Sequence, residues 1–384
     1  LIPGLPEGPE RRKLELALHV AHGNAQLSLK GYVAPETVAA FTEAKRLLDA
    51  GVGTDLQRYA VLYGLFAANY VAARVEPALA LARQIAEVAD RQADVTYRLV
   101  AYRLLGASLL FSGRLREALE SLQHAEQYRD PAKHKALSYR FAMDPGLAVL
   151  FWKIWALLLI GLADPALKLR KQVQMELPDH GHANTVATGT FFAVVWPALV
   201  LGDIEATERD GAELIAYCAE KKVEQFRLFS VIAHACARAT RDPSAENIAA
   251  SRAAFDAEHL SGGRISDSVF ISQFVQALLA AGDVSGAETE LRAGFAFVEE
   301  SGERFWLAEL HRLDGRIALA GPKPNRKRAE ASFRRAIEIA HGQESRFLEL
   351  RAATDLARLQ HATKKGDNLH QLVTSILATI EGGG

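Results

Sequence analysis

An internal repeat is the feature that most constrains how this 384-residue chain can fold. One segment of helical length carries Gly106, a turn follows, and the next segment carries Ala118, Leu122 and Ala125 at helical spacing. Gly106 and Ala118 would lie where two antiparallel helices approach most closely, because a larger side chain at either position would push the helix axes apart. The pattern therefore predicts a hairpin of two tightly packed helices.

The same pattern recurs at intervals of about 40 residues, which indicates a repeat array. The clearest second copy has the residues Gly315, Ala329, Phe333 and Ala336. Looser copies are centred on Ala78, Gly161, Gly202 and Gly282. Each copy can bury only part of its apolar surface until a neighbouring copy covers the rest, so a stack of copies is expected.

The small residues, the turn glycine and the closing proline resemble the tetratricopeptide repeat. This resemblance implies an all-α fold, an α-solenoid of about nine antiparallel helix pairs, in which residues 1–384 form one domain. We expect the first pair to begin near Lys13 and the last to end near Ile380. Pro197 lies inside an apolar run of helical length, and it is expected to kink or interrupt its helix.

Composition and charge narrow the classes of function. Hydrophobic residues make up 49% of the chain and charged residues 24%, so there is enough apolar surface to order its whole length. The net charge of −1 argues against direct binding to nucleic acid or to an anionic membrane surface. Two cysteines favour a reducing, cytoplasmic location. The most apolar stretch, 146–160, is shorter than the roughly 20 residues of a membrane span and predicts a buried helix.

Several stretches resemble the C-terminal helical region of large bacterial signalling proteins. They are LPEGPERRKLELAL at 5–18, GERFWLAELHRLDGRIAL at 302–319 and LELRAATDLARL at 348–359. In that family an adenylate or guanylate cyclase domain, or a DNA-binding domain, precedes a P-loop ATPase of the signal-transduction type. The resemblance implies that this chain is a fragment of a longer multidomain protein and that its role is regulatory.

Two functions follow from these observations. The first is a non-catalytic sensor that binds a protein or a small-molecule effector and controls an upstream ATPase and its output module. The alternative is a stand-alone scaffold that docks a peptide on the concave face of the solenoid. The chain has no phosphate-binding loop of the G-x-x-x-x-G-K-[ST] type and no paired-aspartate cyclase site, so we expect no enzyme activity and no cofactor. The oligomeric state stays open.

Two groups of residues are candidates for contact with a ligand or partner. The first group belongs to a long connector predicted between the third and fourth helix pairs, and long insertions in repeat arrays are often functional. Its members are His134, Tyr139, Arg140 and Asp144. The second group consists of tryptophans on inner helices, which would be either binding anchors or core residues. They are Trp152, Trp155, Trp196 and Trp306.

Three further features suggest a site less strongly. His180 and His182 form the one short cluster of metal-ligand type, but a metal needs three or four converging donors, so we expect a solvated turn and no metal. Cys218 and Cys236 lack the spacing of a redox or metal motif and are expected in the core. His311 is expected to pack within a helix pair. A basic run is either a contact for an acidic group or a solvated turn, and its members are Lys323, Arg326, Lys327, Arg328, Arg334 and Arg335.

Overall fold

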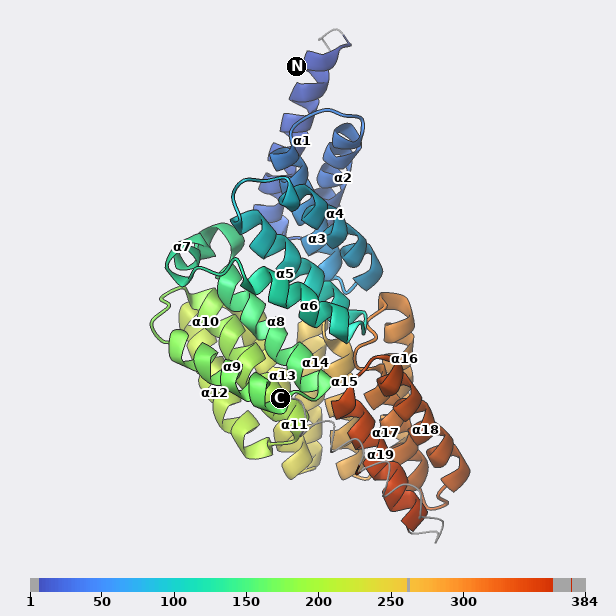
Figure 1. Ribbon diagram of the computed structural model, residues 1–384. Helices are drawn as coiled ribbons and strands as arrows, with labels where there is room; N and C mark the ends of the chain where they lie inside the picture. The colour runs from blue at the N-terminus through green and yellow to red at the C-terminus, as the bar shows by residue number, and fades with distance from the viewer. Residues whose placement is uncertain (1–6, 261–262, 362–373, 375–384) are drawn as a thin grey trace.

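The computed structural model describes residues 7–260, 263–361 and 374, and the regular elements in these ranges are all helices. The helices form antiparallel pairs that stack side by side along the chain (Figure 1). The predicted all-α solenoid is therefore confirmed.

Each pair has an inner and an outer helix. The inner helices are α1 (Pro9–Lys30), α3 (Asp55–Val71), α5 (Thr96–Phe111), α8 (Pro145–Ile160), α10 (Ala183–Thr190) with its continuation η2 (Phe191–Val195) and α11 (Trp196–Leu201), α13 (Glu224–Arg241), α15 (Asp267–Ala280), α17 (Leu307–Ala320) and α19 (Arg346–His361). The outer helices are α2 (Pro35–Asp49), α4 (Val75–Asp90), α6 (Leu115–Glu126), α9 (Ala163–Glu176), α12 (Ile204–Lys221), α14 (Ala245–Leu260), α16 (Val284–Ser301) and α18 (Arg326–Gly342). The described ranges hold eight such pairs, and the predicted end near Ile380 lies outside them.

The connector predicted between the third and fourth pairs contains an additional helix, α7 (Pro131–Phe141). The Asp130 side chain caps this helix by accepting a hydrogen bond from the Lys133 amide. Pro131 is its first residue, a position where the missing N–H costs nothing. The proline that closes one repeat copy, Pro131, therefore also begins the next helix. α7 and α8 meet at an angle of 94°.

Small residues set the closest approach between the helices of a pair. A Cβ atom added to Gly106 would lie 2.5 Å from Leu122 Cγ and 3.2 Å from the Ala118 carbonyl oxygen. A Cβ atom added to Gly315 would lie 2.4 Å from Phe333 Cε1. The remaining positions of the two repeat copies, Ala125, Ala329 and Ala336, are fully buried. The side chain of one helix therefore occupies the space that glycine leaves on the other.

Pro197 follows a local change in helical winding. The five residues Phe191–Val195 form a π-helix, and the Trp196 amide donates to the Phe191 carbonyl. A π turn redistributes the hydrogen bonds of a helix where a proline cannot donate one.

The continuous segment Ala183–Leu201 is long and apolar enough to cross a membrane, and 72% of that window is buried inside the fold. The helix α8 is also buried along almost its whole length, as predicted for 146–160.

The two halves of the solenoid contact each other across its concave side. Carbonyl groups at the C-terminal ends of inner helices from the first half accept hydrogen bonds from the second half. The pairs are Val71 with the Arg264 amide (3.0 Å), Phe111 with the Arg304 amide (2.8 Å), Leu159 with Ser345 Oγ (3.1 Å) and Val200 with Arg351 Nη1 (2.7 Å). The last carbonyls of a helix have no partner within it, so each contact satisfies a group that would otherwise be buried without a hydrogen bond.

These contacts, called the closure below, join inner helices of both halves in one hydrophobic core, while the first pairs and the last helices also have clusters of their own. A single cluster of buried residues extends from Ala73 to Leu348. Across the closure, the ring of Phe305 lies 5.0 Å from that of Phe111 and 6.5 Å from that of Trp196. Figure 1 shows the later pairs, coloured orange and red, beside α6 of the first half. The concave face is therefore largely covered by the chain itself.

We predict that Gly106→Ala lowers the free energy of unfolding by about 1–3 kcal/mol, because the new methyl group overlaps Leu122. The matched control is Gly342→Ala, at the end of α18, where an added Cβ atom meets nothing within 4 Å. The control should be neutral or stabilising by up to about 1 kcal/mol, because alanine favours the helix over glycine. Denaturant unfolding of both variants measures the difference. Equal free energies of unfolding would contradict the close approach at Gly106.

Candidate functional site

The predicted tryptophan contacts lie mostly in the core. Trp155, Trp196 and Trp306 are fully buried, and their interpretation as binding anchors is corrected by this burial. The indole N–H of Trp155 donates to the Phe192 carbonyl (3.0 Å), and that of Trp306 donates to Ser272 Oγ (2.9 Å). Because closure places the other half of the chain over the inner helices, these rings face protein. Trp152 is part of the wall of a cavity described below.

The four connector residues do not converge on one site. Asp144 caps α8, and its Oδ1 accepts from the amides of Gly146 (2.7 Å) and Leu147 (3.0 Å). His134 is buried, and its Nδ1 accepts from the Asp130 amide (3.1 Å). These two side chains therefore stabilise the ends of α7 and α8, which corrects their interpretation as contact residues.

Tyr139 and Arg140 lie on other faces of α7. The Tyr139 side chain is 83% exposed, and its ring packs against that of His182 with the centroids 4.9 Å apart. The guanidinium of Arg140 donates to the Tyr97 hydroxyl (3.0 Å) and lies over the Tyr97 ring. Tyr139 is exposed and Arg140 is already bonded to Tyr97, so these two side chains do not form a pocket together.

The other sequence-predicted features have local partners. His180 is buried against Asp144 (Nε2 to Oδ2, 3.1 Å), so the expectation of a solvated turn is wrong for this residue. Cys218 and Cys236 are buried, and burial raises the pKa of Cys218 to about 11 and that of Cys236 to about 12. The ring of His311 packs against that of Phe295 with the centroids 4.8 Å apart. In the basic run, Arg328 bonds to Glu288 and Asp314, Arg334 to Glu330, and Arg335 to Glu338.

A cavity of about 200 Å³ lies between the inner helices where the two halves meet. Aromatic side chains from several helices form most of its wall. Those from the first half and the centre are Tyr32, Tyr63, Phe66, Tyr70, Phe141, Phe151 and Trp152, and those from η2 and α13 are Phe192, Phe226 and Phe229. Val71, which accepts the hydrogen bond from the Arg264 amide, and Ile265, the residue after Arg264, also line the cavity. The cavity is therefore a product of the closure.

One charged side chain, Arg103 of α5, is part of this aromatic wall. Arg103 is only 5% exposed, its Nε has no hydrogen-bond partner, and Nη1 reaches only the sulfur of Met143 at 3.7 Å. None of the ion pairs in the described part of the chain includes Arg103. A buried cation without an anion is costly, and arginine cannot shed its proton to relieve the cost. The geometry leaves this guanidinium ready to bind an anion.

Polar tyrosines surround Arg103. The hydroxyl of Tyr70 is buried without a partner, and burial raises its pKa well above the usual value. Burial also raises the pKa of Tyr32 to about 12, with Tyr63 adding to the effect and the positive charge of Arg103 opposing it. These hydroxyls remain protonated at neutral pH and can donate to an anion. Asn184 and Gln225 add two amides to the wall.

Arg103 was not predicted as a site residue. It lies on the same helix as Gly106, and the repeat pattern already accounted for the apolar residues of that helix. A signal was present: Arg103 is the one charge in the apolar stretch 99–111. A lone arginine in such a run is either at the protein surface or in a site. Only the three-dimensional structure distinguishes these, because closure decides which side of α5 is covered.

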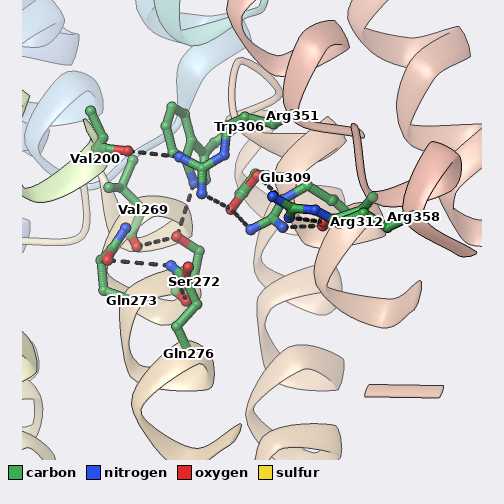
Figure 2. A network of polar contacts seen from close by, with 11 residues as sticks. Val200, Val269, Ser272, Gln273, Gln276, Trp306, Glu309, Arg312, Arg351 and Arg358 are labelled. Atoms are coloured by element: carbon green, nitrogen blue, oxygen red, sulfur yellow. Dashed lines mark hydrogen bonds and ion pairs between the residues drawn. The ribbon is translucent and has the colours of Figure 1, made fainter. Parts of the chain in front are cut away.

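A second polar centre holds the closure together, as Figure 2 shows. Glu309 is 1% exposed and accepts from Arg312 (2.7 and 2.8 Å) and from Arg351 Nη2 (2.9 Å). Arg351 also donates to the Val200 carbonyl, which links α19 to α11. Although burial opposes ionisation, the two guanidiniums keep the pKa of Glu309 below its usual value. All three charges have partners, so this network stabilises the structure and leaves no charge free for a ligand.

The fold and the closed core define a tetratricopeptide-like α-solenoid. Among solved structures, the chain is similar to a Rap protein in complex with competence and sporulation factor, with a TM-score of 0.57 and 14% sequence identity. The match covers 96% of this chain and 90% of that one. At this identity the likeness shows the fold alone, and it does not support the cyclase or ATPase context. No family model and no curated protein matches the chain.

We predict that Arg351→Met lowers the free energy of unfolding by about 1.5–3 kcal/mol, the usual range for hydrogen bonds that involve a charged group. The control is Arg358→Met on the same helix, whose side chain is 76% exposed and pairs with Asp355. An exposed ion pair contributes at most about 1 kcal/mol, so the control should change little. Chemical denaturation of the two variants compares them. A control as damaging as Arg351→Met would contradict the closing role of Arg351.

We also predict that acid destabilises the protein through His134. Burial lowers the pKa of His134, with the charge of Asp144 opposing this effect, so the folded state favours the neutral imidazole. The unfolded chain takes up this proton as the pH falls through about 6.5, so the contribution is complete above that pH and is lost below it. His134→Gln should flatten this part of the stability profile. The exposed control His22→Gln should leave it unchanged, and a profile equally steep in wild type and His134→Gln would refute the assignment.

Proposed function

We propose that this chain is a binding module whose central cavity holds a carboxylate attached to an apolar group, such as the C-terminal residue of a peptide. The single observation that carries the proposal is the buried, unpaired guanidinium of Arg103 in an aromatic wall. Arginine and carboxylate form strong charge-assisted hydrogen bonds, and they are strongest where water is excluded. Aromatic rings supply contact area at a small cost in conformational entropy.

Size limits what the cavity can accept. A cavity of about 150 Å³ holds a benzene ring, so about 200 Å³ accommodates one aromatic or branched side chain with its carboxylate. A long peptide in an open groove does not fit this shape, because the second half covers much of the concave face. We infer that the ligand inserts one end and that the rest of the peptide remains outside the cavity.

The residues of the wall favour binding over catalysis. The described lining residues include no Asp, Glu, His or Cys. Their hydroxyl groups belong to Thr188 and to tyrosines, and the raised pKa of Tyr32 and Tyr70 disfavours the phenolate that would act as a base or nucleophile. The Rap protein named above was solved with competence and sporulation factor bound, which makes a peptide ligand a reasonable class for a solenoid of this shape. This supports the scaffold alternative over control of an ATPase and output module.

The proposal predicts opposite effects of Arg103→Met on stability and on binding. Removing an unpaired buried charge should raise the free energy of unfolding of the ligand-free protein by about 1–4 kcal/mol. The same change should abolish binding of peptides that end in an apolar residue with a free carboxylate. Thermal unfolding measures the first effect, and the fluorescence of Trp152 in the wall follows the second during titration. If Arg103 only supported the fold, Arg103→Met would lower the free energy of unfolding, and this result would contradict the proposal.

The ligand series carries its own control. Each peptide is tested with a free C-terminus and as the C-terminal amide, and the amide should bind at least tenfold more weakly, about 1.4 kcal/mol. Arg83→Met, an exposed arginine on the outer helix α4, should leave both values unchanged. Binding of small aromatic carboxylates but of no peptide would assign the cavity to a small-molecule effector. Equal binding of acid and amide would refute the role of Arg103.

A further inference from the structure

A group of three side chains outside the cavity wall, two of them buried, combines the donor types of a metal site. Glu258 and His259 end the outer helix α14, and Asp267 begins the inner helix α15. One potential ligand atom from each of the three residues lies within 4.8 Å of the other two. His259 Nε2 is 2.9 Å from Asp267 Oδ2, and the His259 ring is held against that of Phe255 with the centroids 4.3 Å apart. One imidazole and two carboxylates therefore converge from two helices.

Several oxygens in this group have no partner. Glu258 is 1% exposed, and neither of its carboxylate oxygens makes a hydrogen bond. Oδ1 of Asp267 and the buried Oγ of Ser266 also have none. A buried carboxylate without a hydrogen bond or a cation carries a large desolvation cost, so its presence demands an explanation. A bound cation would use these oxygens.

Acidic side chains outnumber basic ones around this group. A third carboxylate, Glu303, is fully buried beside the group, and it accepts from the amides of Ser266 (2.7 Å) and Ser268 (3.1 Å). In the described part of the chain, the arginine that contacts these acids is Arg264, whose Nε lies 3.4 Å from Asp267 Oδ2. Arg264 is shared, because Nη1 also reaches Glu300 at 3.3 Å. A divalent ion would balance the charge of these acids in their ionised form, which the one shared guanidinium does not.

We propose that Glu258, His259 and Asp267 form a binding site for a divalent transition-metal ion, and that Zn²⁺ is the ion this donor set suits best. Zinc accepts imidazole and carboxylate ligands together, with bonds of about 2.0–2.2 Å. Ligand atoms of a tetrahedral ion with such bonds are about 3.4 Å apart, so contraction by little more than 1 Å forms the site. The His259 side chain is 36% exposed, and this side gives the ion a path from solvent. Three protein ligands leave a position for water.

The site would join the outer helix of one pair to the inner helix of the next. Glu258 and His259 lie in the last turn of α14, and Asp267 is the first residue of α15. Arg264, between the two ligand groups, makes the closure bond to Val71. Metal binding would therefore restrain a segment that contributes both to the closure and, through Ile265, to the cavity wall. The sequence analysis expected no metal because it considered only the cluster at His180 and His182.

Calorimetric titration of the metal-free full chain with ZnCl₂ tests the proposal. We expect one equivalent of Zn²⁺ to bind and to raise the thermal midpoint. Glu258→Gln and His259→Ala should each weaken binding at least tenfold. The matched control Glu246→Gln, an exposed acid at the start of α14, should bind as the wild type does. Thermal unfolding without metal shows whether each variant is folded, and Glu258→Gln should be about as stable as the wild type, because glutamine has nearly the same volume and replaces a buried acid whose oxygens have no hydrogen-bond partner.

Cobalt(II) gives an independent readout, because a tetrahedral site with mixed nitrogen and oxygen ligands produces visible d–d bands that an octahedral aquo ion lacks. These bands should appear in the wild type and be absent in His259→Ala. Absence of Zn²⁺ binding would overturn the proposal. Binding that survives both Glu258→Gln and His259→Ala would also overturn it and would place the ion elsewhere, with His180 and His182 as the next pair to test.

Discussion

The closure between the two halves is the constraint on which the rest of the structure depends. Helices that end in the middle of a protein leave carbonyl groups without partners, and a stack of helix pairs repeats this problem at every inner helix. Here α3, α5, α8 and α11 direct their C-terminal ends toward the N-terminal turns of α15, α17 and α19, and donors from that half satisfy them. The favourable direction of the helix dipoles adds to these contacts, since positive N-terminal turns meet negative C-terminal ends.

Closure also explains why the candidate site is a cavity rather than an open groove. Once the concave face is covered, its aromatic residues become core, and only the space that the two halves cannot fill remains accessible. Arg103 remains in that space without an anion, although the same protein pairs the buried charges of Arg312, Arg351 and Glu309 completely. A fold that can pair buried charges but leaves Arg103 unpaired has lost stability at that position. Such a loss is typical of a binding site.

The repeat made the fold predictable, and the limits of the prediction follow from what a repeat contains. Spacing of small residues predicts local packing, and the contact of Gly106 with Leu122 depends only on neighbouring helices. The closure joins residues as far apart as Leu159 and Ser345, and no local pattern contains that information. Trp152, Trp155 and Trp196 lie on inner helices as predicted, and Trp306 directly precedes one, but whether those helices face solvent depends on the second half. For the same reason the sequence did not reveal the role of Arg103. The Glu258 cluster and the caps of α7 and α8 involve residues close in sequence, but the repeat pattern does not predict the directions of their side chains.

Hydrogen exchange followed by mass spectrometry on the ligand-free chain tests the closure most directly. The amides of Arg264, Arg304 and Phe305 lie outside helices and donate across the closure to Val71 and Phe111. A closed solenoid predicts that peptides covering these amides exchange as slowly as the inner helices of the core. Exchange as fast as in the exposed turns between pairs would show that the two halves are apart in solution, and it would contradict both the closure and the cavity that depends on it.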